Sequence, residues 1–248
     1  MLADYLNGFV NPFKKREEYY TFTFHQDELM AFCHQTDASV ASFASVLLFK
    51  AMDRVLPKRH QYIRATMAHN PCAALGIPDA HSHMLSHMQI DYKRELASSD
   101  MAKLGTLTRG QMMLQEDPSV SSVELRHNLK MIAAIDGAQG LKQKRKEAKR
   151  MNISLGKGAV HGTYNINYTG YADWGELAAY VDSYVLIVDG HIVIEVSSCG
   201  DKIVIAMMTL VKSAKYINAI EEVLQQLGIT YSLEGPFQKN LPYHEYPR

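Results

Sequence analysis

The sequence has 248 residues and equal numbers of acidic and basic side chains, 26 of each, which gives a net charge of zero. Hydrophobic residues make up 47% of the chain, enough for a globular domain with a substantial core. The neutral balance argues against a general attraction to nucleic acid, and no apolar run is long enough to span a membrane. Three scattered cysteines favour free thiols in a reducing compartment. We therefore expect a soluble cytoplasmic protein without nucleic-acid partners.

Helix signals come first in the chain. Residues 25–37 have the apolar spacing of a short amphipathic helix, and residues 38–56 have that of a longer one. Asp37 is expected to cap the longer helix, which ends before Pro57. The alternation in residues 60–70 then predicts a strand.

A second strand is predicted at residues 83–93, after a loop rich in proline and glycine. Its apolar residues fall on one parity and its polar residues on the other, which indicates a half-buried strand. The apolar set is Met84, Met88, Ile90 and Tyr92, and the polar set is His83, His87, Gln89, Asp91 and Lys93.

The middle of the chain is predicted to be helical, beginning with residues 94–115. Asp117 followed by Pro118 is a strong start signal, because an acidic cap precedes a proline at the first helical position. The helix that starts there is expected to run to Arg150.

The last part of the chain predicts strands around a short helix. Turn signals are Asp189-Gly190 and Gly200-Asp201. The expected elements are a strand at 161–170, a short helix at 173–183, three antiparallel strands within 184–210, a helix at 214–227 and a strand at 229–234. This order predicts an α+β fold, a two-layer sandwich of a mixed, largely antiparallel sheet with helices on one face.

Four stretches are similar to one known family. They are DASVASFASVLLFKAM, YIRATMAHNPCAALG, YNINYTGYADWGELAAYVDSYVL and GDKIVIAMMTL with the later AIEEVLQQLGI. Together they resemble the C-terminal lobe of chloramphenicol-acetyltransferase-like acyltransferases, of the alcohol acetyltransferase and condensation-domain type. The resemblance implies that residues 22–248 form a single acyltransferase-like lobe and that residues 1–21 resemble a linker.

The resemblance also implies a chemistry. In such enzymes two lobes enclose a tunnel where an acyl thioester meets an alcohol or amine acceptor. The co-substrate is acyl-CoA or an acyl-carrier thioester, and no bound cofactor is expected. The second histidine of a His-His-x-x-x-Asp-Gly motif in the N-terminal lobe is the general base. This sequence contains no His-His pair.

Two functions follow, and the sequence leaves open whether the chain is an enzyme. In the first, the chain is half of a thioester-dependent acyltransferase. Its partner is then a complementary N-terminal lobe or copies of itself in an oligomer. In the second, the chain keeps the fold without chemistry and binds a partner protein or an acyl ligand.

His87 is the one catalytic candidate, because His87 and Asp91 form the single His-x-x-x-Asp match. About 0.6 such matches arise by chance in a chain of this composition, so a solvated pair on a strand is the competing interpretation. A zinc site made by His81, His83 and His87 is not expected, because those residues span about 20 Å of extended chain.

The stretch from Asn165 to Trp174 supplies the candidates for a substrate tunnel or a lobe interface. Asp173 followed three residues later by Glu176 is typical of a helix start, and Trp174 would anchor that helix by burying its ring. The candidate residues are Asn165, Asn167, Tyr168, Asp173 and Trp174.

A basic run at residues 141–150 holds six lysines and arginines. It could hold the phosphates of coenzyme A or of a carrier-protein arm. A solvated helix C-terminus whose cations complement the helix dipole explains the run equally well.

Overall fold

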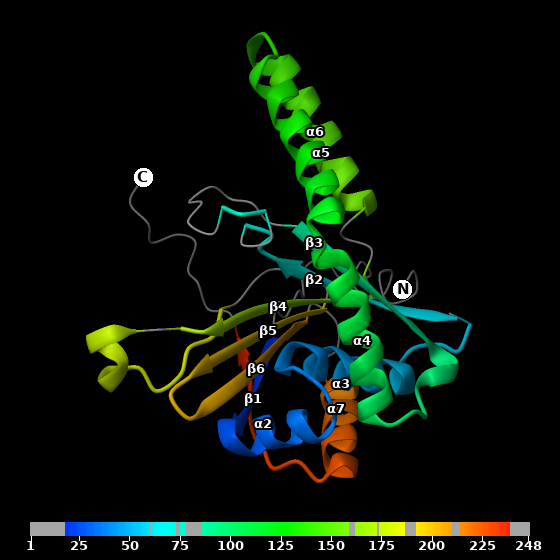
Figure 1. Cartoon of the computed structure of the whole chain (residues 1–248), viewed down its shortest axis with the longest axis vertical. Helices are drawn as coiled ribbons and strands as arrows, with labels where there is room; N and C mark the ends of the chain where they lie inside the picture. The colour runs from blue at the N-terminus through cyan, green and yellow to red at the C-terminus, as the bar shows by residue number, and fades with distance from the viewer. Residues whose placement is uncertain are drawn as a thin grey trace.

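The computed structural model describes residues 18–59, 61–72, 75–77, 86–158, 162–172, 174–186, 192–209 and 214–238. Within these ranges seven strands form one mixed sheet in the order β3-β2-β4-β5-β6-β1-β7 (Figure 1). β2 and β5 each pair with β4 in parallel, and the other neighbours are antiparallel. The strands are β1 (Glu18–His25), β2 (Tyr62–His69), β3 (Ser86–Lys93), β4 (Tyr164–Tyr171), β5 (Ile192–Cys199), β6 (Lys202–Thr209) and β7 (Ser232–Gln238).

Helices α3 and α7 lie side by side on one face of the sheet, and the hairpin of α5 and α6 projects from the body as an arm (Figure 1). No helix in the described part of the chain combines the length and apolarity that a bilayer crossing requires. The helices are α2 (Gln26–Gln35), α3 (Val40–Val55), α4 (Met101–Glu116), α5 (Pro118–Asp136), α6 (Gly140–Gly158) and α7 (Ala214–Leu227), with 3-10 turns η1 (Arg94–Leu96) and η2 (Gly175–Tyr180).

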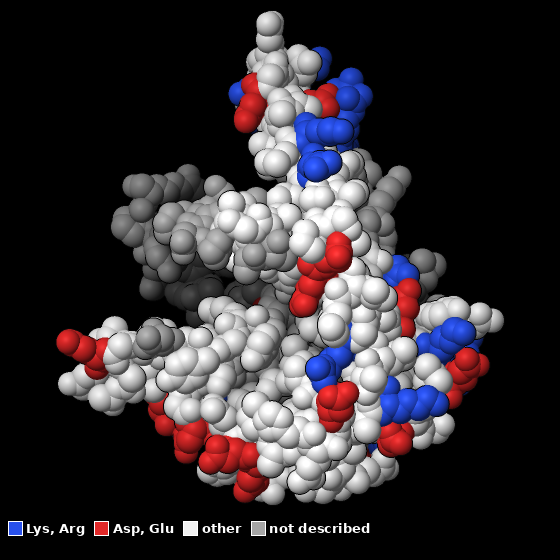
Figure 2. All heavy atoms as spheres, viewed as in Figure 1, with Lys and Arg blue, Asp and Glu red and all other residues white. Residues whose placement is uncertain are grey.

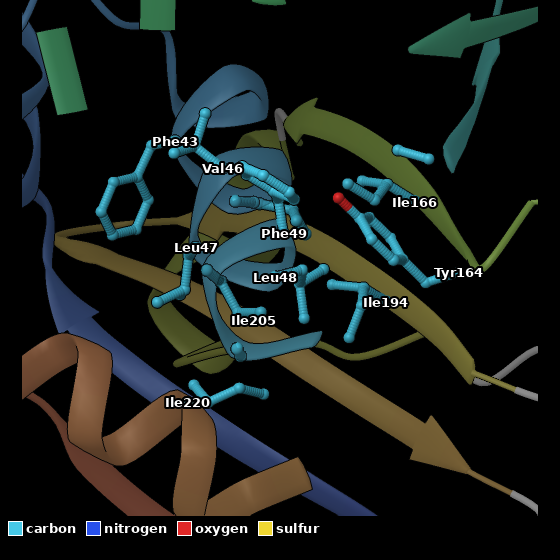
Figure 3. Close-up of a cluster of buried hydrophobic side chains, with 14 of the residues drawn as sticks. Phe43, Val46, Leu47, Leu48, Phe49, Tyr164, Ile166, Ile194, Ile205 and Ile220 are labelled. Carbon is cyan, nitrogen blue, oxygen red and sulfur yellow. The ribbon is translucent and has the colours of Figure 1, made fainter. Parts of the chain in front are cut away.

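The core lies between the sheet and the central helix α3, which is buried nearly all round. A helix that is apolar on every side is typical of such a position. Each large side chain fully buried there contributes about 1.5–3 kcal/mol. Figure 3 shows Phe43, Val46, Leu47, Leu48 and Phe49 of α3 against Tyr164, Ile166, Ile194 and Ile205 of the sheet and Ile220 of α7. The predicted fold class, a mixed sheet with helices, is confirmed.

A small network of hydroxyl groups joins α3, α4 and the sheet inside this core. The hydroxyls of Ser45 and Tyr92 lie 2.7 Å apart, and those of Tyr92 and Thr108 lie 2.8 Å apart. The Tyr164 hydroxyl donates to the Ser45 carbonyl at 2.8 Å. Burial raises the pKa of Tyr92 to about 12, so its hydroxyl stays protonated and can donate.

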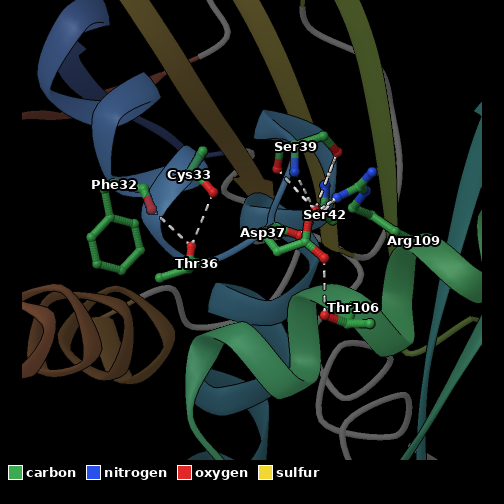
Figure 4. Close-up of polar contacts among 8 residues, drawn as sticks. All are labelled: Phe32, Cys33, Thr36, Asp37, Ser39, Ser42, Thr106 and Arg109. Atoms are coloured by element: carbon green, nitrogen blue, oxygen red, sulfur yellow. Dashed lines mark hydrogen bonds and ion pairs between the residues drawn. The ribbon is translucent and has the colours of Figure 1, made fainter.

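The predicted cap of α3 is wrong by two residues. Ser39 caps the helix: its hydroxyl accepts from the Ser42 amide at 3.2 Å, and the Ser42 hydroxyl accepts from the Ser39 amide at 2.8 Å. Asp37 has a positive φ of 47°, and its carboxylate instead accepts bonds from Thr106 and Arg109 of α4 (Figure 4). Asp37 therefore ties α4 to the start of α3.

The single helix predicted from Pro118 to Arg150 is also wrong, although Asp117 caps its start as expected. The chain turns between Asp136 and Gly140, where Gly140 has a φ of 77°, and continues as the separate helix α6. The basic run consequently lies in the N-terminal half of α6. Complementing the dipole of a helix C-terminus therefore does not explain it.

Two further predictions about strands need correction. Residues 184–186 form no strand, because both sides of β5 are already occupied, by β4 and by β6. The turn predicted at Asp189-Gly190 lies outside the described residues. Strand β1 was not predicted, and it includes residues 18–21 of the linker-like segment. The turn at Gly200-Asp201 is confirmed as the β5–β6 hairpin.

Candidate functional site

A cavity of about 590 Å³ lies where β3 begins, beneath the first turns of α5. Two histidines, His87 of β3 and His127 of α5, belong to its wall. The other described residues of the wall provide hydroxyls, one amide and two apolar side chains: Ser86, Gln115, Ser119, Ser121, Val120 and Val123. Imidazole and hydroxyl groups beside an apolar wall can bind a small polar molecule and move a proton.

Helix α4 fixes one side of this cavity through two glutamines. Gln115 accepts from the Gln89 amide at 2.8 Å and donates to the Gln89 carbonyl at 2.9 Å. In the same way, Gln111 accepts from the Asp91 amide at 2.9 Å and donates to the Asp91 carbonyl at 3.3 Å. Residues four apart on a helix are about 6 Å apart along its axis, and residues two apart on a strand are about 6.7 Å apart. Because these spacings are nearly equal, both glutamines of α4 can reach the backbone of β3. The glutamines thereby hold α4 along β3.

The structure separates His87 from Asp91. Both side chains lie on the same face of β3, but four strand residues span about 13 Å. Both carboxylate oxygens of Asp91 accept from Arg64, at 2.5 and 2.7 Å. This ion pair raises the pKa of Arg64, chiefly through the hydrogen bond. His87 therefore has no carboxylate partner in Asp91, and the second titratable group in the cavity wall is His127.

A buried polar pair lies further along the same face of the sheet. Asn167 of β4 donates to the carboxylate of Glu195 in β5 at 2.5 Å. Glu195 is 5% exposed, and burial raises its pKa to about 7, against the opposing hydrogen bond from Asn167. Glu195 is not among the site residues predicted from the sequence. Its signal is a lone acid within the apolar stretch HIVIEV, where an ionised carboxylate is costly.

The predicted tunnel residues on β4 are divided between the two faces of the sheet. Asn165 and Asn167 lie on the face of β4 turned away from α3, whereas alternation puts Tyr168 on the opposite face. Partial burial raises the pKa of Tyr168. His87 and Glu195 are separated by two intervening strands, or about 14 Å.

Trp174 lies outside the core. It is half-buried, and its ring contacts Tyr184 edge-on with centroids 5.5 Å apart. Helix η2 has no side-chain cap and no buried residue. Asp173 lies outside the described residues, as do His81 and His83. Within the described ranges no three His, Cys, Asp or Glu side chains are grouped as a metal site requires.

Comparisons by sequence find no relative: no family model and no curated protein matches the chain. Solved structures do match. TRI101 of Fusarium sporotrichioides, solved with coenzyme A and T-2, has a TM-score of 0.56 at 9% identity, over 90% of this chain and 52% of its own. The trichothecene 15-O-acetyltransferase TRI3 of the same organism has a TM-score of 0.55 at 8% sequence identity, and the match covers 91% of this chain and 52% of TRI3. A condensation domain of the enacyloxin polyketide synthase has a TM-score of 0.52 at 10% sequence identity, and the match covers 92% of this chain and 44% of that chain.

The chain has the acyltransferase and condensation-domain fold. The resemblance drawn from the sequence is thus confirmed at the level of fold, which is what these identities establish. The chain spans about half the length of the acyltransferase-fold structures that it matches.

Proposed function

We propose that the chain supplies one half of a thioester-dependent acyl transfer enzyme with an alcohol or amine acceptor. The proposal rests on the unequal coverage of the two chains in each structural match. At least 90% of this chain is covered by TRI101, TRI3 and the condensation domain, but only 44–52% of each of those chains is covered in return. The chain therefore corresponds in size to one lobe of a two-lobed fold.

The complementary half comes from another lobe, in the same or a separate polypeptide, or from a second copy. Because this sequence has no His-His-x-x-x-Asp-Gly motif, a complementary lobe would bring the general base. In a homo-oligomer the base must come from this chain, and His87 in the β3–α5 cavity is the candidate. Acyl-CoA or an acyl-carrier thioester is the donor in both arrangements.

The assembly is tested on protein purified from its native source, by intact mass together with light scattering. Copurification of a second chain with His-His-x-x-x-Asp-Gly, or that motif in a longer natural polypeptide, supports the two-lobe arrangement. A homo-oligomer with acyl transfer activity supports a tunnel made by copies. A monomer that neither recruits a lobe nor transfers acyl groups contradicts the proposal.

The chemistry is tested by following thiol release from acetyl-CoA with a panel of alcohols and amines. In the homo-oligomer we expect His87→Ala to abolish release and His34→Ala, an exposed histidine on α2, to leave it unchanged. Where a second lobe is present, His87→Ala should leave release intact. Saturable binding of coenzyme A without release in any arrangement would favour the alternative, a binding protein that keeps the fold.

A further inference from the structure

The α6 helix of the projecting arm exposes six lysines and arginines, and four of them align along one side of the helix. Within residues 140–150, the half-buried residues Glu147 and Ala148 mark the side that packs on α5. Four exposed cations lie on the other side at positions i, i+3, i+4 and i+7, a spacing that forms a single row about 10 Å long. We call this row the basic stripe; its members are Lys142, Arg145, Lys146 and Lys149. Figure 2 shows lysine and arginine side chains gathered along the arm.

The basic stripe has little neutralising charge around it. The stretch 118–150 contains eight lysines and arginines and three acids, a net charge of +5 in a chain whose total is zero. Glu147 bonds Arg150, at 2.8 Å, and not the stripe. None of the four stripe residues forms an ion pair with another residue that the structure describes.

The stripe begins at the N-terminal end of its helix and lies far from the C-terminal end. Lys142 lies in the first turn of α6 and Lys149 in the third, whereas the helix continues to Gly158. The N-terminus of a helix carries positive partial charge and disfavours cations. The intrinsic electrostatics of α6 therefore do not account for the stripe.

The surroundings of the stripe restrict what could bind it. Residues 118–150 include no Phe, Tyr or Trp, so they offer neither a stacking platform for single-stranded nucleic acid nor aromatic anchors for a membrane. Between Leu141 and Arg150 the apolar residues are Leu141 and Ala148 alone, too few to enter a lipid interface. A straight row of one charge at helical spacing matches a facing helix with acids at the same spacing.

We propose that the basic stripe docks an acidic helix of a partner protein, with carboxylates at positions i, i+3, i+4 and i+7. This docking surface is separate from the proposed acyl transfer site, because residues 140–150 of α6 are not among the residues that line the β3–α5 cavity. The docked helix would lie along α6, with Arg145 and Lys146 at the centre of the contact and Lys142 and Lys149 at its two ends.

The test measures binding of a labelled helical peptide of about 16 residues with glutamates at that spacing. A second peptide has the same composition but distributes its glutamates around the helix. Fluorescence anisotropy at about 50 mM and about 300 mM salt separates ion pairing from apolar contact. The matched variants are R145E/K149E on the stripe and R126E/K130E on the exposed surface of α5.

We expect the spaced peptide to bind more tightly than the distributed one and to weaken at the higher salt concentration. R145E/K149E should weaken binding by about tenfold, and R126E/K130E by less than about threefold. A peptide with lysines in place of glutamates should then prefer R145E/K149E. Circular dichroism confirms that both variants stay folded.

Three results would overturn the proposal. Equal weakening by both variants would mean that only net charge matters. Tighter binding to vesicles with about 30% phosphatidylserine, or to a duplex of about 20 base pairs, would assign the stripe to a membrane or to DNA. Self-association that R145E/K149E abolishes would assign it to a second copy of this chain.

Discussion

The side chain of Gln115 binds the backbone of Gln89 in both directions, accepting from its amide at 2.8 Å and donating to its carbonyl at 2.9 Å. A helix side chain thus takes the place that a neighbouring strand would occupy. The Gln115 amide nitrogen also donates to the Gln111 carbonyl at 3.0 Å, which holds the side chain in this orientation.

Replacing Gln115 with alanine should lower the free energy of unfolding by about 1–2 kcal/mol, because two backbone groups of β3 lose their partner. Hydrogen exchange at the Gln89 amide should accelerate more than at neighbouring amides of β2. Gln143→Ala on the exposed surface of α6 is the matched control. Unchanged exchange at Gln89 would mean that the glutamine pair does not persist in solution.

Two glycine-to-alanine substitutions should change stability in opposite directions. A Cβ at Gly162 would lie 2.5 Å from the Thr66 hydroxyl oxygen and 2.8 Å from the Tyr164 carbonyl oxygen, and the backbone atom cannot rotate away. Gly162→Ala should cost about 1–3 kcal/mol. Gly110 lies inside α4 with nothing within 4 Å, so Gly110→Ala should gain about 0.5–1 kcal/mol. Urea unfolding measures both, and a stabilising Gly162→Ala would contradict the packing around Thr66.

Removing the Tyr92 hydroxyl should destabilise the core through its polar network rather than through lost volume. In Tyr92→Phe the Ser45 hydroxyl loses its bond, whereas Thr108 keeps its bond to the Leu104 carbonyl at 2.8 Å. A loss of about 1–3 kcal/mol is expected in thermal or urea unfolding. Tyr180→Phe, at a side chain that is 86% exposed, should have no effect. A neutral Tyr92→Phe would show that the network adds nothing to stability.

The Glu195 carboxyl should make stability depend on pH. Its folded pKa of about 7 exceeds the ordinary value of 4.5, so the folded state binds its proton more tightly than the unfolded state does. The stability that this proton contributes is complete below pH 4.5 and is lost as the pH rises through 7. Over that window the loss amounts to at most about 3 kcal/mol.

The neutral isostere Glu195→Gln separates this effect from others. It should stabilise the protein at about pH 8 and leave stability nearly unchanged at about pH 5, as measured by urea unfolding at both pH values. Asn167 can donate to the new amide oxygen as it does to the carboxylate. Equal effects at both pH values would argue that Glu195 is already ionised in the folded protein at pH 5.

The sequence predicted those elements whose residues fix them locally. The alternation around Met88 and Ile90, the start at Asp117-Pro118 and the turn at Gly200-Asp201 each depend on neighbours within a few residues. The strand expected near Tyr184 failed because its place depends on which strands flank β5, and those come from distant parts of the chain.

Sites were harder to predict than elements. The His87–Asp91 match suggested a pair, but Arg64 from another strand binds Asp91 and His127 from α5 shares the cavity with His87. Neither contact has a local signature. Glu195 had one, a lone acid in an apolar strand, and its raised pKa comes from burial that only the tertiary structure creates.

The glutamine pairs on β3 also determine how this sheet can meet another molecule. An open sheet has two outer strands, and each invites a further chain to add on by backbone hydrogen bonding, the first step of domain swapping and aggregation. On β3, Gln111 and Gln115 bind the backbone groups of Asp91 and Gln89 that a further strand would use. The other outer strand, β7, contains Pro236, which has no amide hydrogen to offer. Among the strands that the structure describes, both outer edges thus carry a feature that disfavours extension of the sheet, which favours association through side-chain surfaces.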